Sequence, residues 1–294
     1  MAVVTVKGTE YHIDEKLFKN WNKIKDGRLK KKDEDRVFIV DGREGTGKSV
    51  FAIQQAAYVD ESILDDMSRI TFTAEQTLNA IRNTRSTLEH TKAIIFDEAF
   101  KGLASRSAVS KINKTVIQAL MEMRQNNLLL FIVLPSFYML DLYPAVSRSN
   151  ALIHISKDKE GQKRSFRVFN YAKKARLYDL GLKKGWNYKV YTNFKGRFSG
   201  KFPGGDEYYQ KYLKAKQDAL ITTTNTSEIV NPDAGINKFE LKARDELPLI
   251  YVSIQKRMGW SDKEAEEEFK KMGIPKVASQ MSVYRGKVAK LIAN

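Results

Sequence analysis

The stretch of sequence that decides the fold is Gly42-Arg43-Glu44-Gly45-Thr46-Gly47-Lys48-Ser49. It fits the pattern G-x-x-x-x-G-K-[ST], in which glycines let the backbone bend closely and point its N–H groups at phosphate oxygens. The mainly apolar run 37–41 before it is typical of a buried strand, and residues 47–59 after it are typical of a helix. The N-terminus of that helix adds partial positive charge. We therefore predict a phosphate-binding loop between a strand and a helix.

Two side chains of this loop have specific expected tasks. Lys48 is expected to neutralise the β- and γ-phosphates of a nucleotide, and Ser49 is expected to bind Mg²⁺ through its hydroxyl. We expect the whole stretch from Gly42 to Val50 to contact the nucleotide. A chance glycine-rich turn is the alternative, and the predicted strand and helix on either side argue against it.

Two carboxylates directly follow four apolar residues in a second stretch, Ala93-Ile94-Ile95-Phe96-Asp97-Glu98. The apolar residues predict a buried strand, and ligands of open parallel sheets bind at the carboxyl ends of the strands. We therefore expect Asp97 to hold Mg²⁺ and Glu98 to polarise the attacking water. A strand that simply ends in two solvated acids is the alternative.

Further apolar runs and helical patterns alternate around these two stretches. Three of the runs are expected to be strands: 69–73, 128–134 and 151–155. Two segments are expected to be helices: 74–85, which Thr73 can cap, and the amphipathic segment 111–126. Strands that alternate with helices predict an α/β fold with a mostly parallel sheet covered by helices on both faces.

The two stretches resemble the Walker A and Walker B motifs of P-loop NTPases. The adjacent Asp97 and Glu98 are similar to the acidic pair of the additional-strand branch with a catalytic glutamate, known as ASCE. The 49 residues from Lys48 to Asp97 leave room for one further strand–helix unit. The resemblance implies that the chain binds ATP with Mg²⁺ and hydrolyses it. ATP is favoured over GTP because Asn113-Lys114, which begins like the N-K-x-D guanine signature, lies inside a predicted helix.

Three later stretches resemble the FtsK/HerA and Zot-type motor ATPases: residues 123–127, 140–141 and 146–153. In these families the strand after Walker B usually ends in a polar residue that senses the γ-phosphate. Ser136 holds that place here, where the families commonly carry glutamine. The resemblance also implies an arginine finger that reaches the nucleotide of a neighbouring subunit. Arg148 is the first candidate, Arg124 its rival and Arg106 a weaker one; a turn serine and surface arginines are the alternatives.

The chain is strongly basic, with 51 Lys and Arg against 35 Asp and Glu. Most of the excess lies in residues 151–220, which carry 17 basic and 6 acidic side chains interleaved with aromatic rings. Basic groups bind phosphates by releasing counterions, and exposed aromatic rings can stack on unpaired bases. We therefore expect a nucleic acid, DNA first, as a partner. A lysine-rich surface that serves only solubility is the alternative.

Other classes of protein are excluded by what the sequence lacks. It has no cysteine, so disulfides, thiol nucleophiles and cysteine zinc sites are absent. Its longest apolar run, 128–140, is interrupted at Pro135 and Ser136 and is shorter than the roughly 18–20 residues of a membrane span. We expect no membrane insertion and a cytoplasmic location.

The organisation that we predict has five parts, of which the ATPase core is the second. They are an N-terminal hairpin and helix at 1–35, the core at 36–156, a basic aromatic-rich extension at 157–221, a linker at 222–245 and a small helical domain at 246–294. Within the first part we expect a hairpin in 2–12, a helix at 14–25 and the start of a charged linker, 30–36. The extension is expected to contain β-ribbons at 164–171 and 188–198 and a polar helix at 204–221. The last part is expected to hold helices at 247–258, 262–272 and 278–293, either as a helix-turn-helix or as a three-helix assembly domain.

These observations predict an ATP-hydrolysing nucleic-acid translocase that acts as a homo-oligomeric ring. A viral genome-packaging or DNA-transfer motor is the first interpretation, with a portal or other assembly protein as a candidate partner. A helicase or helicase loader shares the same core and is the second. An ATP-switched DNA-binding or assembly protein is the third, and it would show little stimulation of hydrolysis by DNA.

Overall fold

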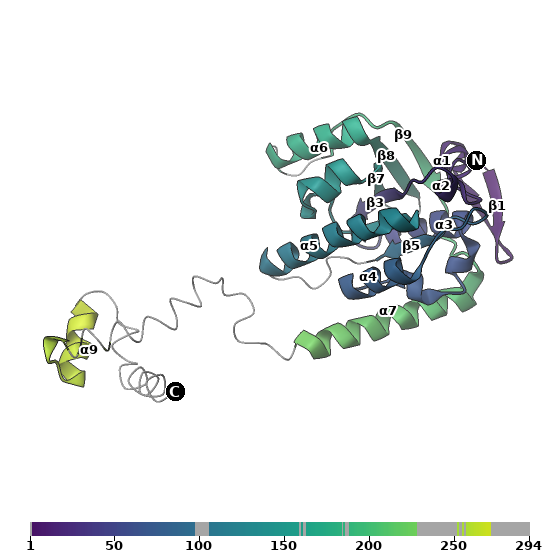
Figure 1. Cartoon of the computed structure of the whole chain (residues 1–294). Coiled ribbons are helices and arrows are strands. Elements are labelled where there is room, and N and C mark those ends of the chain that lie inside the picture. Colours follow the sequence, from purple (N-terminus) through teal and green to yellow (C-terminus); the bar gives the residue numbers. More distant parts are fainter. Residues whose placement is uncertain are drawn as a thin grey trace. The chain divides into compact units, whose positions relative to one another are not determined.

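The computed structural model describes residues 2–97, 106–158, 160, 163–183, 185, 188–227, 252, 255 and 257–271. The chain divides into two compact units, Met1–Glu228 and Ile229–Asn294. The first unit is an α/β domain, which Figure 1 shows in purple to light green. Among the described residues, no helix is both long and apolar enough to cross a membrane.

A seven-stranded sheet forms the centre of the first unit, in the order β4-β5-β6-β3-β7-β8-β9. Its strands are β3 (Arg36–Gly42), β4 (Ile70–Thr71), β5 (Ala93–Phe96), β6 (Leu129–Leu134), β7 (Ala151–Lys157), β8 (Arg164–Asn170) and β9 (Phe194–Phe198). The pairs from β4 to β7 are parallel, and β8 and β9 add two antiparallel pairs. The predicted mostly parallel sheet is therefore confirmed.

Helices cover both faces of this sheet, as predicted. Alternate residues of β6 show the two faces, because Phe131 belongs to one apolar cluster and Ile132 to the other. The first face packs against α3 (Lys48–Val59), and the second packs against α4 (Ala74–Asn83), α5 (Arg106–Glu122) and α6 (Tyr171–Lys183). Since both faces are covered, all six residues of β6 are buried.

The N-terminal segment is a hairpin and a helix that pack on α3. The hairpin strands β1 (Ala2–Val6) and β2 (Thr9–Ile13) join through Lys7 and Gly8, whose positive φ angles of 46° and 73° suit a two-residue turn. The helix α1 (Glu15–Trp21) begins after Asp14, which accepts from the backbone N–H of Lys16 at 2.9 Å. Trp21 of this helix donates to Gln55 of α3 at 2.7 Å.

Two predicted boundaries near the N-terminus differ from the structure. The predicted helix at 14–25 stops at Trp21, and a short helix α2 (Arg28–Lys31) occupies the start of the predicted charged linker. Asp26 and Gly27 have positive φ angles of 57° and 70°, which a continuous helix does not allow. Leu29 of α2 is buried, so this charged stretch is held to the core by one apolar side chain.

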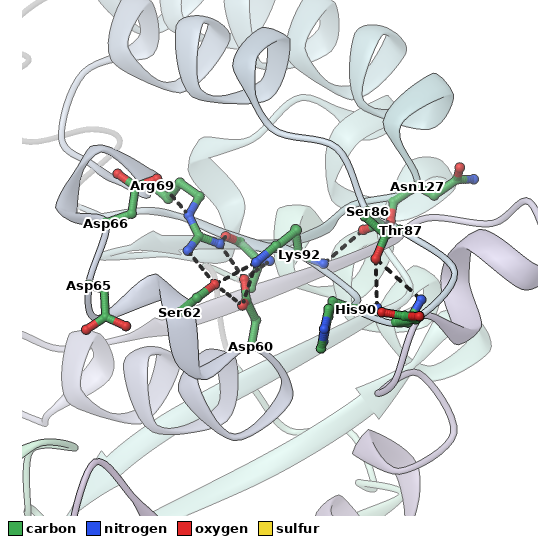
Figure 2. A network of polar contacts seen from close by, with 12 residues as sticks. Asp60, Ser62, Asp65, Asp66, Arg69, Ser86, Thr87, His90, Lys92 and Asn127 are labelled. Carbon is green, nitrogen blue, oxygen red and sulfur yellow. Dashed lines mark hydrogen bonds and ion pairs between the residues drawn. The ribbon is translucent and has the colours of Figure 1, made fainter.

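A buried polar network fixes α3 against the sheet (Figure 2). Asp60, at the C-terminal end of α3, forms an ion pair with Arg69 and accepts from the backbone N–H of Ala93 at 2.9 Å. Arg69 also donates to Ser62 at 2.9 Å, and Lys92 donates to the same hydroxyl at 2.7 Å. The network joins the end of the helix that follows the phosphate loop to the start of β5, and so aligns the two elements that carry the site.

The basic extension is part of the same sheet and begins no new structural unit at residue 156. The register from Ala151↔Asn170 to Lys157↔Arg164 continues β7 directly into β8, and β9 pairs with β8 in turn. Phe166 and Phe169 are fully buried, so these rings pack the core. The helix α6 was not predicted, because its basic side chains obscure the short apolar stripe around Leu177.

The helix α7 (Gly205–Ser227) is longer than the predicted 204–221 and runs into the stretch expected to be a linker. The helices at 74–85 and 111–126 also have shifted ends. Thr73 caps α4 in a capping box with Gln76, as predicted, and α4 ends at Asn83. α5 ends at Glu122, and a 3₁₀ turn, η3 (Met123–Asn126), follows it because Asn127 adopts a positive φ of 54°.

In the second unit the structure describes one complete predicted helix, α9 (Asp262–Lys271). Ser261 caps it, since its backbone N–H donates to Glu264 at 2.7 Å and its hydroxyl accepts from the backbone N–H of Glu264 at 3.4 Å. Of the predicted helix 247–258, residues 252, 255, 257 and 258 are described, and they are helical. The predicted helix 278–293 lies outside the described residues.

Candidate nucleotide-binding site

The stretch from Gly42 to Ser49 forms a loop between β3 and α3, where it was predicted. Gly42, Gly45 and Gly47 have positive φ angles of 147°, 71° and 92°. A Cβ on Gly42 would lie 2.3 Å from the carbonyl oxygen of Ile155 on the neighbouring strand, so no larger residue fits there. The glycine pattern is therefore explained by the shape that the backbone takes.

The loop closes on itself through Arg43. The carbonyl oxygen of Arg43 accepts from the hydroxyl of Thr46 at 2.8 Å and from Nζ of Lys48 at 2.9 Å. Gly47 is the N-cap of α3 and makes no side-chain cap hydrogen bond. The first N–H groups of α3 therefore lie at an N-terminus suited to an anion, next to the Lys48 ammonium.

Asp97 lies at the carboxyl end of β5 and is fully buried. One of its carboxylate oxygens accepts from the hydroxyl of Ser49 at 2.9 Å. The other accepts from the hydroxyl of Tyr212 on α7 at 2.6 Å. The structure thus brings together Ser49 and Asp97, which were predicted to bind Mg²⁺. Hydroxyl and carboxylate oxygens are the donor types that Mg²⁺ prefers, so the pair fits this metal. Glu98, the predicted catalytic glutamate, lies outside the described residues.

A cavity of about 520 Å³ opens in front of the loop, within the range of about 300–1,000 Å³ usual for small-molecule sites. Its walls come from three parts of the fold. They are the phosphate loop and the start of α3 (Glu44, Gly45, Gly47, Lys48, Ser49, Val50), the ends of β5 and β6 (Asp97, Val133, Leu134, Pro135) and α7 (Tyr209, Tyr212, Leu213, Lys216).

The α7 wall is the part of the site that sequence reasoning missed. Nζ of Lys216 lies 3.9 Å from a carboxylate oxygen of Asp97 and 3.3 Å from the hydroxyl of Tyr212. The sequence shows α7 as a polar helix of the basic extension, far from both Walker motifs. Its tyrosines at 208, 209 and 212 were a signal of a buried aromatic face, because residues three and four apart share one side of a helix.

A second buried carboxylate, Asp41, lies immediately before the loop and was also missed. It accepts from the backbone N–H of Phe137 at 2.9 Å, and it lies 2.9 Å from Nδ1 of His154. The hydroxyl of Tyr188 also donates to it. Burial and the nearby Asp41 carboxylate raise the pKa of Tyr188 above its usual range. This cluster attaches the end of β6 and the 188–193 segment to the base of the loop.

Ser136, the predicted sensor, is half-buried and follows the end of β6. Its side chain hydrogen-bonds Tyr188, which lowers the pKa of that tyrosine in opposition to the burial. Its neighbour Pro135, in contrast, lines the cavity. Through Tyr188, Ser136 is connected to the Asp41 cluster.

Two of the three finger candidates, Arg148 and Arg124, lie at the amino ends of the strands, opposite the loop. Arg148 forms a two-pronged ion pair with Asp35, with one nitrogen–oxygen distance of 3.1 Å, and donates to the carbonyl of Leu120 at 3.0 Å. These contacts make Arg148 a structural link in its own subunit, and its role as a finger stays a prediction. Arg124 lies on η3 and is exposed. The side chain of Arg106 is not among those that the structure describes.

The basic residues of the extension fall into two environments. Lys174 is fully buried and donates to the carbonyl of Val146 at 2.9 Å and to that of Ser149 at 2.5 Å. Burial lowers the pKa of Lys174 to about 7. In contrast, Lys195 and Arg197 on β9 are exposed, close in sequence to Tyr191, whose exposed fraction is 91%. Lys195 and Arg197 therefore face solvent, whereas Lys174 does not.

Comparison with known proteins yields similarity to solved structures; no family model and no curated protein matches the sequence. The chain is similar to the N-terminal domain of zonular occludens toxin from Neisseria meningitidis, with 15% identity over 60% of this chain and 98% of that one and a TM-score of 0.31. It is also similar to a KaiC-like protein from Pyrococcus horikoshii, with 12% identity, coverages of 58% and 88% and a TM-score of 0.34. The DNA-packaging ATPase of Sulfolobus Turreted Icosahedral Virus shows 11% identity, coverages of 48% and 94% and a TM-score of 0.31.

The order of the strands distinguishes between the branches of proteins with such a loop. The strand β3 precedes the phosphate loop, and β5 ends at Asp97. In the sheet, β6 lies between them and pairs in parallel with both. The strand–helix unit expected between Lys48 and Asp97 is β4 with α4, and β4 lies at the edge of the sheet beside β5. The strand inserted between β3 and β5 is instead β6, which follows Asp97 in the chain, and Ser49 contacts Asp97 as expected. The chain therefore has the fold of a P-loop NTPase of the additional-strand, ASCE type.

Proposed function

We propose that the protein is a Mg²⁺-dependent ATPase that moves a nucleic acid, and that it acts as a ring in viral genome packaging or DNA transfer. One observation carries the proposal: the cavity has the phosphate loop on one side and α7, a helix of the basic extension, on the other. ATP hydrolysis at Lys48 and Asp97 would therefore take place in contact with the basic extension, which holds most of the positive charge.

The residues of the cavity suit phosphoryl transfer to water. Lys48 offsets charge on the β- and γ-phosphates, and the N–H groups at the start of α3 hold phosphate oxygens. Mg²⁺, held through Ser49 and Asp97, would supply further positive charge beside the phosphates when bound. Glu98, next in sequence to Asp97, is assigned to orient the attacking water.

A ring is proposed because the described part of the cavity lining contains lysines and no arginine. Among the described residues that line it, lysines 48 and 216 are the basic side chains. An arginine that stabilises charge developing on the γ-phosphate would therefore come from a neighbouring subunit. Arg124 is exposed and suits that role better than Arg148, which is paired with Asp35.

The first test is steady-state ATP hydrolysis without DNA, with single-stranded DNA and with duplex DNA. Glu98→Gln serves as the blank, and Glu75→Gln, an exposed glutamate on α4, serves as the matched control. We expect duplex DNA to stimulate hydrolysis by the wild type and the control. Stimulation by single strands alone would favour a helicase, and hydrolysis indifferent to both would favour an ATP-switched assembly protein. If the wild type hydrolyses ATP no faster than Glu98→Gln, the proposed ATPase activity itself is wrong.

The second test concerns the basic surface of β9. A plot of log affinity for DNA against log salt concentration has a negative slope. In the double variant Lys195→Gln/Arg197→Gln this slope should become less steep by about two, since two phosphate contacts are lost. The control pair Lys31→Gln/Lys32→Gln is exposed but lies outside the extension, and should leave the slope unchanged. Equal slopes for both double variants would remove β9 from the proposed nucleic-acid contact.

A further inference from the structure

The cavity contains a second lysine that comes from neither Walker motif. Lys216 lines it from α7, opposite the loop that carries Lys48. The side chain of Lys216 is 21% exposed, and its Nζ lies 3.9 Å from a carboxylate oxygen of Asp97. The ammonium is therefore close to the residue that was predicted to hold Mg²⁺, and it faces the same space as the phosphate loop.

The position of Lys216 is set by Tyr212, one helical turn earlier. The Tyr212 hydroxyl donates to Asp97 at 2.6 Å, and Nζ of Lys216 lies 3.3 Å from that hydroxyl oxygen. The ring of Tyr212 is buried, with Phe72 and Phe202 at centroid distances of 5.9 Å and 5.6 Å. An aromatic cluster thus holds this part of α7 in place.

The N-terminal side of α7 is also attached to the helix that follows the loop. Gln54 of α3 is buried, and its amide nitrogen donates to the carbonyls of Ser199 at 2.9 Å and Lys201 at 2.7 Å. These residues immediately precede α7. Since α3 carries the loop, these contacts connect the loop to the segment that leads into α7.

A polyphosphate in this cavity would be more negative than the lining can balance with Lys48 alone, because Glu44 and Asp97 add carboxylates to the wall. A flexible ammonium on the opposite wall relieves that imbalance, since charge-assisted hydrogen bonds to phosphate are among the strong ones. We propose that Lys216 is a second phosphate-binding cation, supplied by α7 of the same subunit, and that Tyr212 positions it. This inference rests on the proposed nucleotide site.

A different role for Lys216 would be to compensate the buried Asp97 carboxylate without any contact to the ligand. The two roles predict different measurements. If Lys216 only compensates Asp97, a variant without this lysine should have a lower thermal midpoint in the absence of nucleotide. Its folded fraction should bind nucleotide with unchanged affinity. If Lys216 binds phosphate, a variant without this lysine should remain folded and bind nucleotide with lower affinity.

The experiment compares Lys216→Met with Lys214→Met, which removes an exposed lysine from the same helix. Equilibrium binding of a fluorescent N-methylanthraniloyl-ATP to the full chain is measured with Mg²⁺ and with EDTA, alongside circular dichroism. We expect Lys216→Met to weaken binding by roughly tenfold or more in both conditions, as a lost charge-assisted hydrogen bond requires. Lys216→Arg keeps a cation and should recover most of the affinity, whereas Lys214→Met should bind like the wild type.

Equal affinity for the wild type and Lys216→Met would overturn the proposal, as would an equal loss in Lys214→Met. If Lys216→Met does not fold, Lys216→Gln replaces it, with the same expected loss. Tyr212→Phe keeps the ring and removes the hydroxyl, and should weaken binding less than Lys216→Met. Failure of the wild type and Lys214→Met to bind the probe would instead remove the proposed nucleotide site itself.

Discussion

Two buried carboxylates, Asp60 and Asp97, show how the fold treats a charge that only supports structure and one that faces a site. Asp60 is paired with the Arg69 guanidinium and accepts from the backbone N–H of Ala93 at 2.9 Å. Asp97 accepts from the hydroxyls of Ser49 and Tyr212, and the Lys216 ammonium is 3.9 Å away. The first is compensated at close range by a cation. The second accepts from two hydroxyls beside a cavity, with the lysine ammonium at a longer distance.

The largest effect is expected from breaking the Asp60 pair. Asp60→Asn leaves the buried Arg69 guanidinium with only the half-exposed Asp66 carboxylate as a counter-charge, which should lower the free energy of unfolding by about 3–5 kcal/mol. Urea denaturation measures this change. Asp66→Asn is the control, because its carboxylate lies 3.2 Å from Arg69 but is 53% exposed, and it should cost about 1 kcal/mol or less. Equal losses in the two variants would contradict the comparison.

The next largest effect concerns Asp97 and appears in catalysis. Asp97→Asn keeps an oxygen acceptor for Ser49 or Tyr212 but removes the negative charge beside the cavity. We expect kcat for ATP to fall roughly 100- to 1,000-fold, as for the loss of one electrostatic group of an active site. Asp179→Asn, an exposed aspartate on α6, should leave kcat unchanged. Hydrolysis at the wild-type rate by Asp97→Asn would show that this carboxylate is structural, like Asp60.

A third buried charge, Lys174, extends the comparison to pH. Burial lowers its pKa in the folded protein to about 7, whereas the unfolded chain keeps the usual value of 10.5. Between these values the unfolded state binds more protons, so stability should rise with pH in this window. Relative to Lys174→Met, the wild type should gain on the order of 1 kcal/mol of unfolding free energy per pH unit above pH 7. Urea denaturation of both proteins at pH 7, 8 and 9 measures the difference, and parallel pH profiles would contradict it.

The smallest effect is expected at Arg148. Arg148→Gln removes the ion pair with Asp35 and should lower the free energy of unfolding by about 1–3 kcal/mol. Hydrolysis per folded molecule should stay at the wild-type level, because the contacts of this side chain lie at the edge of the sheet opposite the loop. A loss of hydrolysis by about 1,000-fold or more in a folded, oligomeric variant would instead restore Arg148 as the arginine finger.

Much of the fold could be predicted from the sequence because its signals are local. The run before Gly42, the glycines themselves and the apolar stretch before Asp97 each encode their element within a few residues. Thr73 was identified as a helix cap for the same reason. The helix α6 escaped detection because lysines and arginines interrupt its apolar stripe, and a buried lysine within it, Lys174, has the appearance of a surface residue in the sequence.

The sequence by itself determined the phosphate loop, the alternation of strands and helices between residues 36 and 155 and the pairing of Ser49 with Asp97, since each follows from spacing along the chain or from the rule that parallel strands share an edge. Only the tertiary structure decided what else meets there. Tyr212 contacts Asp97 from 115 residues away, and Tyr188 contacts Asp41 from 147 residues away. Spacing and periodicity report which face of an element is apolar, and they carry no information on which distant element covers it. The α7 wall and the Asp41 cluster therefore could not be predicted from the sequence and are known only from the tertiary structure.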